Sequence, residues 1–405
     1  MSVAPSVHLP ASISLRALTD SPAALPPAGV PLLDVQRQYR AIQREVAQAI
    51  QRVCDSGRFI MGPDCEQLEQ SVASYCQVPH AVACASGSDA LLLALMAYGI
   101  GRGDEVLMPS YTFFATASAA WRLGAKPVFV DIDPVSFNVS PRHLESLITP
   151  ATKAILPVHL YGQCADLRAI GAIARRHHLP VIEDAAQAIG AEFEGRRAGS
   201  IGEIGCLSFY PTKNLGCFGD GGLVTTGDAQ IAERLRLLRA HGMQPRYHHQ
   251  VVGINSRLDT LQAAVLNVKL RYLEGWTAGR QANARRYSEM FAACGMDRVL
   301  GLPVLSVNGR HVWNQYVIRV PDGRRDLLRT FLAEQKIGTE IYYPVPLHLQ
   351  ACFESLGYSP GSLPESERAA RETLALPIFP ELTAAEQQVV VQAISTFFKH
   401  PRRSG

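Results

Sequence analysis

Short apolar segments alternate with amphipathic ones over the first half of the chain. Apolar runs of four or five residues predict strands, and segments with apolar residues three or four positions apart predict helices. Strands are expected at 81–84, 105–108, 127–131, 154–158 and 180–183, and helices at 89–98, 112–123 and 167–177. This alternation is typical of an α/β fold, in which helices cover both faces of a mostly parallel central sheet. Ligands of such sheets lie beyond the carboxyl ends of the strands.

The pattern differs on either side of this region. Helices are predicted at 39–53, 65–75, 229–241 and from 258 continuously through 291; later come strands at 313–320 and 339–343 and helices at 326–335 and 384–398. Residues 1–30 are rich in Ala, Pro and Ser without any period, which predicts a disordered extension rather than a signal peptide. We therefore expect a large domain at 31–269 and a smaller α+β domain at 270–405.

The composition excludes several classes of protein. A net charge of +3 without a basic patch gives no reason to expect a nucleic-acid partner. The chain has no run of about eighteen apolar residues, so no membrane segment is expected. It has nine cysteines, an odd number, without a C-x-x-C pair or histidines at metal-ligand spacing. This usage predicts reduced thiols in a cytoplasmic protein and no metal site.

Asp184 and Lys213 give the first indication of chemistry. Asp184 follows the apolar strand at 180–183, and Lys213 follows the next strand, ahead of the glycine-rich turn at 219–222. A pyridoxal phosphate (PLP) enzyme needs this pair, because the lysine forms a Schiff base and the carboxylate holds the pyridine nitrogen protonated. Alternatively, Asp184 caps a helix and Lys213 is a surface residue. The apolar residues before Lys213 argue against its exposure.

Other residues can supply the remaining contacts to such a cofactor. Gly87 and Ser88 stand at a predicted helix start, which suits a phosphate, and the Ser208 hydroxyl can reach the same group. Phe113 can cover the ring, and Gln187 can bind its hydroxyl. Two of these features have simpler explanations as well. Ser-Gly-Ser-Asp is an ordinary helix cap, and Phe113 is equally well explained as a core residue.

Several segments together have the pattern of a known family. They are Gly-Arg-Phe-Ile-Met-Gly at 57–62, Ser-Gly-Ser-Asp-Ala-Leu at 86–91, Glu-Asp-Ala-Ala-Gln at 183–187, Ser-Phe-Tyr-Pro-Thr-Lys at 208–213 and Asn-Ser-Arg-Leu-Asp at 255–259. The chain resembles the DegT/StrS-type, PLP-dependent sugar aminotransferases of fold type I from Pro31 to about Phe398. Members often have Asn-Gly-Thr at 86–88, but Ser88 keeps the hydroxyl. Some members are dehydratases with His at the Schiff-base position, so Lys213 indicates transamination.

The resemblance implies a homodimer with shared active sites. It implies that Asn255 reaches across the interface to the phosphate of the PLP bound by the partner subunit. It also implies that Arg257 and His348 lie near the substrate. For Arg257 an alternative is an interface role in which it pairs with Asp259 or Asp220.

The activity implied by the resemblance is transfer of an amino group to a nucleotide-linked sugar. L-Glutamate would donate the group, leaving 2-oxoglutarate, and a keto group of a dTDP- or UDP-linked sugar would accept it in amino-sugar biosynthesis. Segments 161–166 and 210–216 are more similar to members that aminate C3 than to those that aminate C4. Two alternatives stay open: an aminocyclitol or aminobenzoate-type synthase, and a non-catalytic regulatory protein, which would be expected to lack Lys213.

Overall fold

The computed structural model describes residues 29–305 and 309–399. The predicted extension at 1–30 therefore lies outside the described residues, apart from Gly29 and Val30. Val30 is fully buried and forms a parallel bridge with Ile337, so the chain is anchored from that point onward. None of the helices within the two described ranges is long and apolar enough to cross a membrane.

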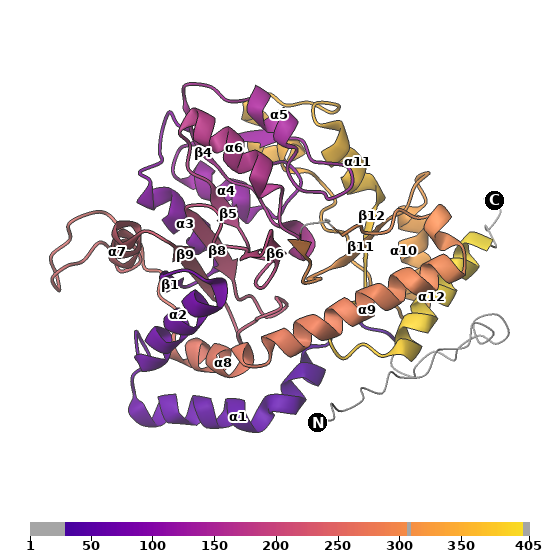
Figure 1. Cartoon of the computed structure of the whole chain (residues 1–405), viewed down its shortest axis with the longest axis horizontal. Helices are drawn as coiled ribbons and strands as arrows, with labels where there is room; N and C mark the ends of the chain where they lie inside the picture. The colour runs from indigo at the N-terminus through magenta and orange to yellow at the C-terminus, as the bar shows by residue number, and fades with distance from the viewer. Residues whose placement is uncertain (1–28, 306–308, 400–405) are drawn as a thin grey trace, which may run out of the picture.

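A central sheet forms the middle layer of the molecule (Figure 1). Its strands lie in the order β3-β2-β4-β5-β8-β9-β1, with isolated parallel bridges joining the β4 and β5 regions. All pairs are parallel except those of β9, which runs antiparallel to β8 and β1. The strands are β1 (His80–Cys84), β2 (Glu105–Pro109), β3 (Lys126–Val130), β4 (Thr152–Ile155), β5 (Ile182–Asp184), β8 (Ile204–Ser208) and β9 (Gly222–Thr226). The predicted α/β fold with a mostly parallel sheet is confirmed.

Helices cover both faces of this sheet. One face is packed by α3 (Gly87–Ala97), α4 (Ala115–Arg122) and α7 (Ala229–Leu238). The other is packed by α2 (Pro63–Cys76), α6 (Leu167–His177) and α8 (Thr260–Leu270), with α5 (Pro141–Ser146) beside α6. Because both faces are covered, the strands are apolar almost throughout, which explains why they appeared as continuous apolar runs.

The outermost helix, α1 (Val35–Ser56), lies along α8 rather than on the sheet (Figure 1). Its start is capped by Asp34, whose carboxylate accepts hydrogen bonds from two backbone N–H groups of the first turn. Its end is formed by Gly57 in the left-handed conformation, at φ 65°.

The C-terminal part has a hydrophobic cluster of its own. The long helix α9 (Leu273–Ala293) leads into it, as Figure 1 shows. Its further elements are β11 (Tyr316–Arg319), α10 (Arg325–Glu334), α11 (Pro364–Glu372), β12 (Thr373–Leu376) and α12 (Ala384–Lys399). The short strands β6 (Glu192–Phe193), β7 (Arg196–Arg197) and β10 (Gly309–Arg310) form a separate small sheet. The division of the chain at residue 270 stays a prediction.

Two sequence-based expectations about these elements are wrong. The continuous helix expected from 258 through 291 is interrupted between α8 and α9, where Tyr272 stacks on Trp276 and bonds to Glu45 of α1. The strand expected at 339–343 is reduced to one bridge at Glu340. The backbone around Tyr342 is hydrogen-bonded to tyrosine hydroxyls instead of to another strand.

Candidate active site

Asp184 stands at the carboxyl end of β5 with its side chain buried. Its Oδ2 accepts a hydrogen bond from the Thr116 hydroxyl at 2.8 Å, and its Oδ1 accepts one from the Ala186 N–H at 3.2 Å. Burial raises the pKa of Asp184 above its ordinary value, although these hydrogen bonds and the positive charge of Lys213 oppose the rise. A buried carboxylate of this kind gains most from a cationic partner, such as a protonated pyridine ring.

Lys213 lies in the turn that follows β8, and its side chain is partly buried. Burial lowers the pKa of its amine to about 8, despite the opposing charge of Asp184. A substantial fraction of the amine is therefore neutral near physiological pH, as a nucleophilic lysine requires. The turn is held in place by the Asn214 side chain, which donates to the Val312 carbonyl at 2.8 Å, and by the Lys269 ammonium, which donates to the Gly216 carbonyl.

The start of α3 forms a cradle for an anion. Its first residue, Gly87, faces Ser208: a Cβ on Gly87 would lie 2.6 Å from the Ser208 Cβ, so a larger residue does not fit there. Ser86 caps the helix through its hydroxyl, which accepts from the Asp89 N–H at 3.1 Å, and Ser88 is exposed on the first turn. The predicted cap and the predicted phosphate site are therefore compatible, because the remaining helix-start N–H groups can bind a phosphate.

Phe113 and Gln187 are connected through Tyr343. Phe113 is 55% exposed, so it is not a core residue, and its ring centroid lies 6.0 Å from that of Tyr343. Gln187 donates to the Tyr343 hydroxyl at 3.0 Å and accepts from the Tyr161 N–H at 2.7 Å. The Gln187 amide is thus held by the protein on both its oxygen and its nitrogen. A contact to a cofactor hydroxyl would use the second hydrogen of its nitrogen.

The residues that the family resemblance placed near the substrate differ in their exposure. His348 is only 2% exposed, with Nδ1 2.6 Å from the Ser110 hydroxyl and Nε2 3.3 Å from Glu367. Burial lowers the pKa of His348, although Glu367 opposes this. The ring is enclosed by protein groups, so this geometry supports a role in positioning the loop after β2 rather than a direct substrate contact.

Asn255 and Arg257 lie in the loop before α8. Asn255 is exposed and Arg257 is partly exposed. Arg257 forms no ion pair with Asp259, Asp220 or any other acidic residue in the ranges that the structure describes. Within one chain its guanidinium is therefore left for a ligand or a second subunit.

Sequence analysis missed several residues that shape the site. Thr116 and Tyr343 orient Asp184 and Gln187, but neither belongs to a recognisable motif. Glu183, next to Asp184, has a structural role that its motif does not indicate. Its carboxylate accepts from the N–H groups of Gly199, Ile201 and Gly202 at 2.8, 2.7 and 2.6 Å.

A fourth contact completes the Glu183 cluster. Its Oε2 lies 2.7 Å from Nε2 of His159, whose Nδ1 accepts from the Ala165 N–H at 3.2 Å. Burial by itself raises the pKa of Glu183, but the His159 contact and the N–H bonds outweigh it and bring the pKa below its ordinary value. Neighbouring residues of a strand point to opposite faces, and this alternation is the signal that could have separated the structural Glu183 from Asp184.

These residues together fit PLP. They provide a partly neutral lysine, a buried carboxylate that gains from a cation, and a helix start that glycine opens to a phosphate. Lys213 and Asp184 would hold the ring side of the cofactor, and Gly87, Ser88 and Ser208 the phosphate side.

Comparison with known proteins gives the same assignment. The family model described as "DegT/DnrJ/EryC1/StrS aminotransferase family" matches residues 40–395. The chain is 51% identical to the "Pleiotropic regulatory protein" of Geobacillus stearothermophilus, covering 92% of this chain and 99% of that protein. It is 46% identical to the "dTDP-3-amino-3,4,6-trideoxy-alpha-D-glucose transaminase" of Streptomyces venezuelae, covering 90% and 95%.

Among solved structures, NtdA from Bacillus subtilis with bound cofactor PMP superposes with a TM-score of 0.87 at 33% identity, covering 97% of this chain and 90% of that one. The family match spans the central sheet and most of the C-terminal part. The predicted family, cofactor and type of reaction are confirmed. The chain belongs to the DegT/DnrJ/EryC1/StrS aminotransferase family and is a PLP-dependent aminotransferase.

Proposed function

We propose that this enzyme transfers an amino group from L-glutamate to C3 of a dTDP- or UDP-linked keto sugar in amino-sugar biosynthesis. The observation that carries the proposal is that Lys213 and Asp184 lie close enough for each to influence the other's pKa, while the helix start at Gly87 lies against Ser208. Arg257, from another motif of the family, has no acidic partner among the described residues. The relative named as a dTDP-3-amino sugar transaminase supports C3 and a nucleotide-linked substrate.

Each residue of the site has a definite task in this reaction. PLP, when bound, supplies an electron sink that stabilises negative charge at the carbon bonded to the transferred nitrogen. The buried Asp184 keeps the cofactor nitrogen protonated. Lys213, whose pKa is lowered to about 8 by burial, attaches the cofactor and then moves a proton as a general base. Gly87, Ser88 and Ser208 anchor the phosphate.

Arg257 is the proposed anchor for substrate charge. A guanidinium without a carboxylate partner suits either the glutamate carboxylate or the diphosphate of a nucleotide sugar. Charge-assisted hydrogen bonds of this kind contribute about 1.5–3 kcal/mol, so their loss weakens binding roughly tenfold to a hundredfold.

The experiment offers the purified holoenzyme L-glutamate and a panel of dTDP- and UDP-linked 3-keto and 4-keto sugars. We expect amination of a 3-keto sugar with formation of 2-oxoglutarate, identified by mass spectrometry. Arg257→Ala should raise the KM for at least one substrate, whereas Arg285→Ala, which changes an exposed arginine of α9, should not. If only 4-keto sugars are aminated, the C3 assignment is wrong. If neither the 3-keto nor the 4-keto sugars are aminated, the assignment to nucleotide-linked keto sugars is wrong.

We also propose a homodimer whose active sites are shared. Large apolar side chains are exposed at Phe59, Ile60 and Met61 between α1 and α2, at Phe218 shortly after Lys213 and at Val252 shortly before Asn255. Exposed apolar side chains of this size are typical of a surface that another chain covers. The exposed Asn255 would then contact the phosphate in the partner's site, as the resemblance implies.

Mixed dimers test this arrangement. Chains carrying Lys213→Ala and chains carrying Asn255→Ala should each be inactive, and mixing them should restore activity, because one of the two sites in a mixed dimer is then intact. A fully active monomer in light scattering, or no restoration in verified mixed dimers, would contradict it.

A regulatory role is the second candidate, because the 51% identical relative is named a pleiotropic regulatory protein. The presence of both Lys213 and Asp184, each influencing the other's pKa, favours turnover over a purely regulatory role. An aminocyclitol or aminobenzoate-type synthase is the remaining alternative within the family, and a cyclitol that carries a keto group belongs in the substrate panel for that reason.

A further inference from the structure

A groove of about 750 Å³ lies at the opposite edge of the sheet from the active site. Its wall includes Val181, which precedes β5, and Glu203, which precedes β8. Asp184 and Ser208 end the same two strands, so the active site lies at the carboxyl edge and the groove at the amino edge. At about 3.3 Å per residue, the five steps from Glu203 to Ser208 separate the two by roughly 16 Å.

Cations outnumber anions in this groove. Arg168, Arg175 and Arg196 line it, together with Glu194 and Glu203. Arg168 is paired with Glu194, and Glu203 accepts a hydrogen bond from the Val181 N–H at 2.6 Å. Arg196 donates to the Ser200 carbonyl.

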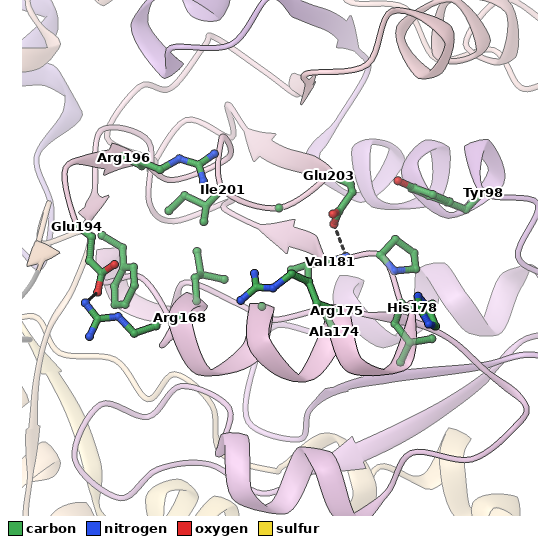
Figure 2. A pocket seen from close by; sticks show the side chains of 16 residues that line it. Tyr98, Arg168, Ala174, Arg175, His178, Val181, Glu194, Arg196, Ile201 and Glu203 are labelled. Carbon is green, nitrogen blue, oxygen red and sulfur yellow. Dashed lines mark hydrogen bonds and ion pairs between the residues drawn. The ribbon is translucent and has the colours of Figure 1, made fainter.

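Arg175 differs from the other two arginines of the groove in its contacts. In the part of the chain that the structure describes, its guanidinium has neither a hydrogen bond nor an ion pair. Figure 2 shows the side chain extending between the Arg168–Glu194 pair and Glu203. The guanidinium lies over Gly171 of its own helix, where a Cβ would be 3.4 Å from Nη1, so the absence of a side chain there leaves it room.

The rest of the groove is partly apolar. Phe193, Leu179 and Ile201 contribute to its lining, and Tyr98 lies near Glu203 (Figure 2). Burial, aided by the charge of Glu203, raises the pKa of Tyr98 to about 12, so its phenol stays neutral and can donate a hydrogen bond. Small-molecule sites typically have a volume of about 300–1,000 Å³ and combine apolar lining with a few polar groups.

We propose that this groove is a second ligand site, which binds a phosphorylated small organic molecule through Arg175. The phosphate pairs with the guanidinium, which prefers planar, two-pronged contacts to phosphate oxygens. The organic body covers the apolar lining near Phe193 and Ile201. The site is separate from the proposed catalytic function and does not depend on it.

The groove is also connected to the active site through hydrogen bonds. Ile201 and Gly202 line it, and their N–H groups donate to Glu183, the neighbour of Asp184. A ligand bound in the groove therefore contacts the loop that holds Glu183, the neighbour of Asp184. The site is in a position to regulate turnover.

Ligand binding to the holoenzyme tests the proposal, because PLP then fills the catalytic phosphate cradle. Labelled UDP and labelled inorganic phosphate are equilibrated with the protein by dialysis in a phosphate-free buffer. Arg175→Ala is compared with Arg176→Ala, the adjacent residue, which pairs with Glu145 outside the groove. Arg257→Ala identifies any binding of UDP at the active site.

We expect one class of UDP sites to be weakened about tenfold to a hundredfold by Arg175→Ala, as expected for charged hydrogen bonds, and less than twofold by Arg176→Ala or Arg257→Ala. UDP should bind this class at least about tenfold more tightly than inorganic phosphate, because the organic body adds apolar contacts. Equal binding in Arg175→Ala and the wild type would overturn the site. Phosphate binding as tightly as UDP would overturn the organic ligand.

Discussion

The two edges of the central sheet use charged residues in opposite ways. At the carboxyl edge, Asp184 is buried and Lys213 is partly buried, and this burial raises the pKa of the acid and lowers that of the amine to about 8. At the amino edge, Arg175 is exposed at the surface of α6. Burial shifts the pKa values of the first pair toward those of reactive groups, and it leaves the Asp184 carboxylate in need of a cationic partner such as a cofactor. Exposure, in contrast, suits Arg175 to reversible binding.

The contrast also holds within β5 itself. Glu183 and Asp184 are neighbours, yet Glu183 has four hydrogen-bond partners from the protein and Asp184 has two. We infer that Glu183 acts on stability and Asp184 on chemistry, because a carboxylate that is saturated by protein donors has little capacity for a ligand.

Replacing Lys213 with alanine should have the largest effect. The variant loses its covalent attachment to PLP and its general base, so kcat should fall by about a thousandfold or more. Absorbance spectroscopy checks the attachment and an amination assay checks kcat. Lys153→Ala, on the exposed side of β4, serves as the control and should be unchanged. Ordinary turnover by Lys213→Ala would refute the assignment of this residue.

Asp184→Asn should lower kcat by about a hundredfold or more, because an amide does not hold the cofactor nitrogen protonated. The melting temperature of the cofactor-free protein should stay the same or rise. Burial raises the pKa of Asp184, so its charged form opposes folding and its removal relieves that cost. If Asp184→Asn instead lost much stability and kept its activity, Asp184 would have the structural role that we assign to Glu183.

Glu183→Gln should act in the opposite way. The glutamine would place an amide nitrogen, which cannot accept, against the backbone N–H groups that donate to Glu183. At least one N–H group would then lack an acceptor, so we expect a loss of about 2–4 kcal/mol in the free energy of unfolding. Because the pKa of Glu183 is lowered, its contribution to stability is present at neutral pH and is lost as the pH falls through the folded-state pKa. Urea titration measures both effects, and Glu354→Gln, on an exposed residue, is the matched control.

The attachment of PLP should report the pKa of Lys213 directly. Only the neutral amine attacks the cofactor, so the attachment rate of the cofactor-free protein should rise with pH and level off above the pKa of about 8. Between pH 7 and pH 9 this gives about a tenfold increase, whereas a lysine of ordinary pKa near 10.4 gives nearly a hundredfold increase. Stopped-flow absorbance distinguishes the two, and the steeper profile would show that Lys213 is not buried as described.

Much of the candidate active site could be proposed from the sequence because its parts are local. Gly87 and Ser88 begin a helix, Asp184 ends β5 and Lys213 follows β8, so the parallel sheet brings them to one edge. Tyr343 could not be placed, because its segment had the pattern of a strand, yet its backbone bonds to tyrosine side chains from elsewhere. The burial of His348 could not be predicted either, because its contacts to Ser110 and Glu367 join segments that are distant in sequence.

The sequence by itself determined the alternation of strands and helices and the positions of the lysine and the carboxylate, which indicate the cofactor. The family followed from the resemblance of five motifs to a known family. Periodicity, residues at the ends of elements and short motifs are all local properties. Only the tertiary structure decided that Glu183 is structural, that Arg257 has no acidic partner within the described residues and that Arg175 stands in a groove. Burial and hydrogen-bond saturation depend on residues far apart in the chain, so they emerge only when the chain has folded.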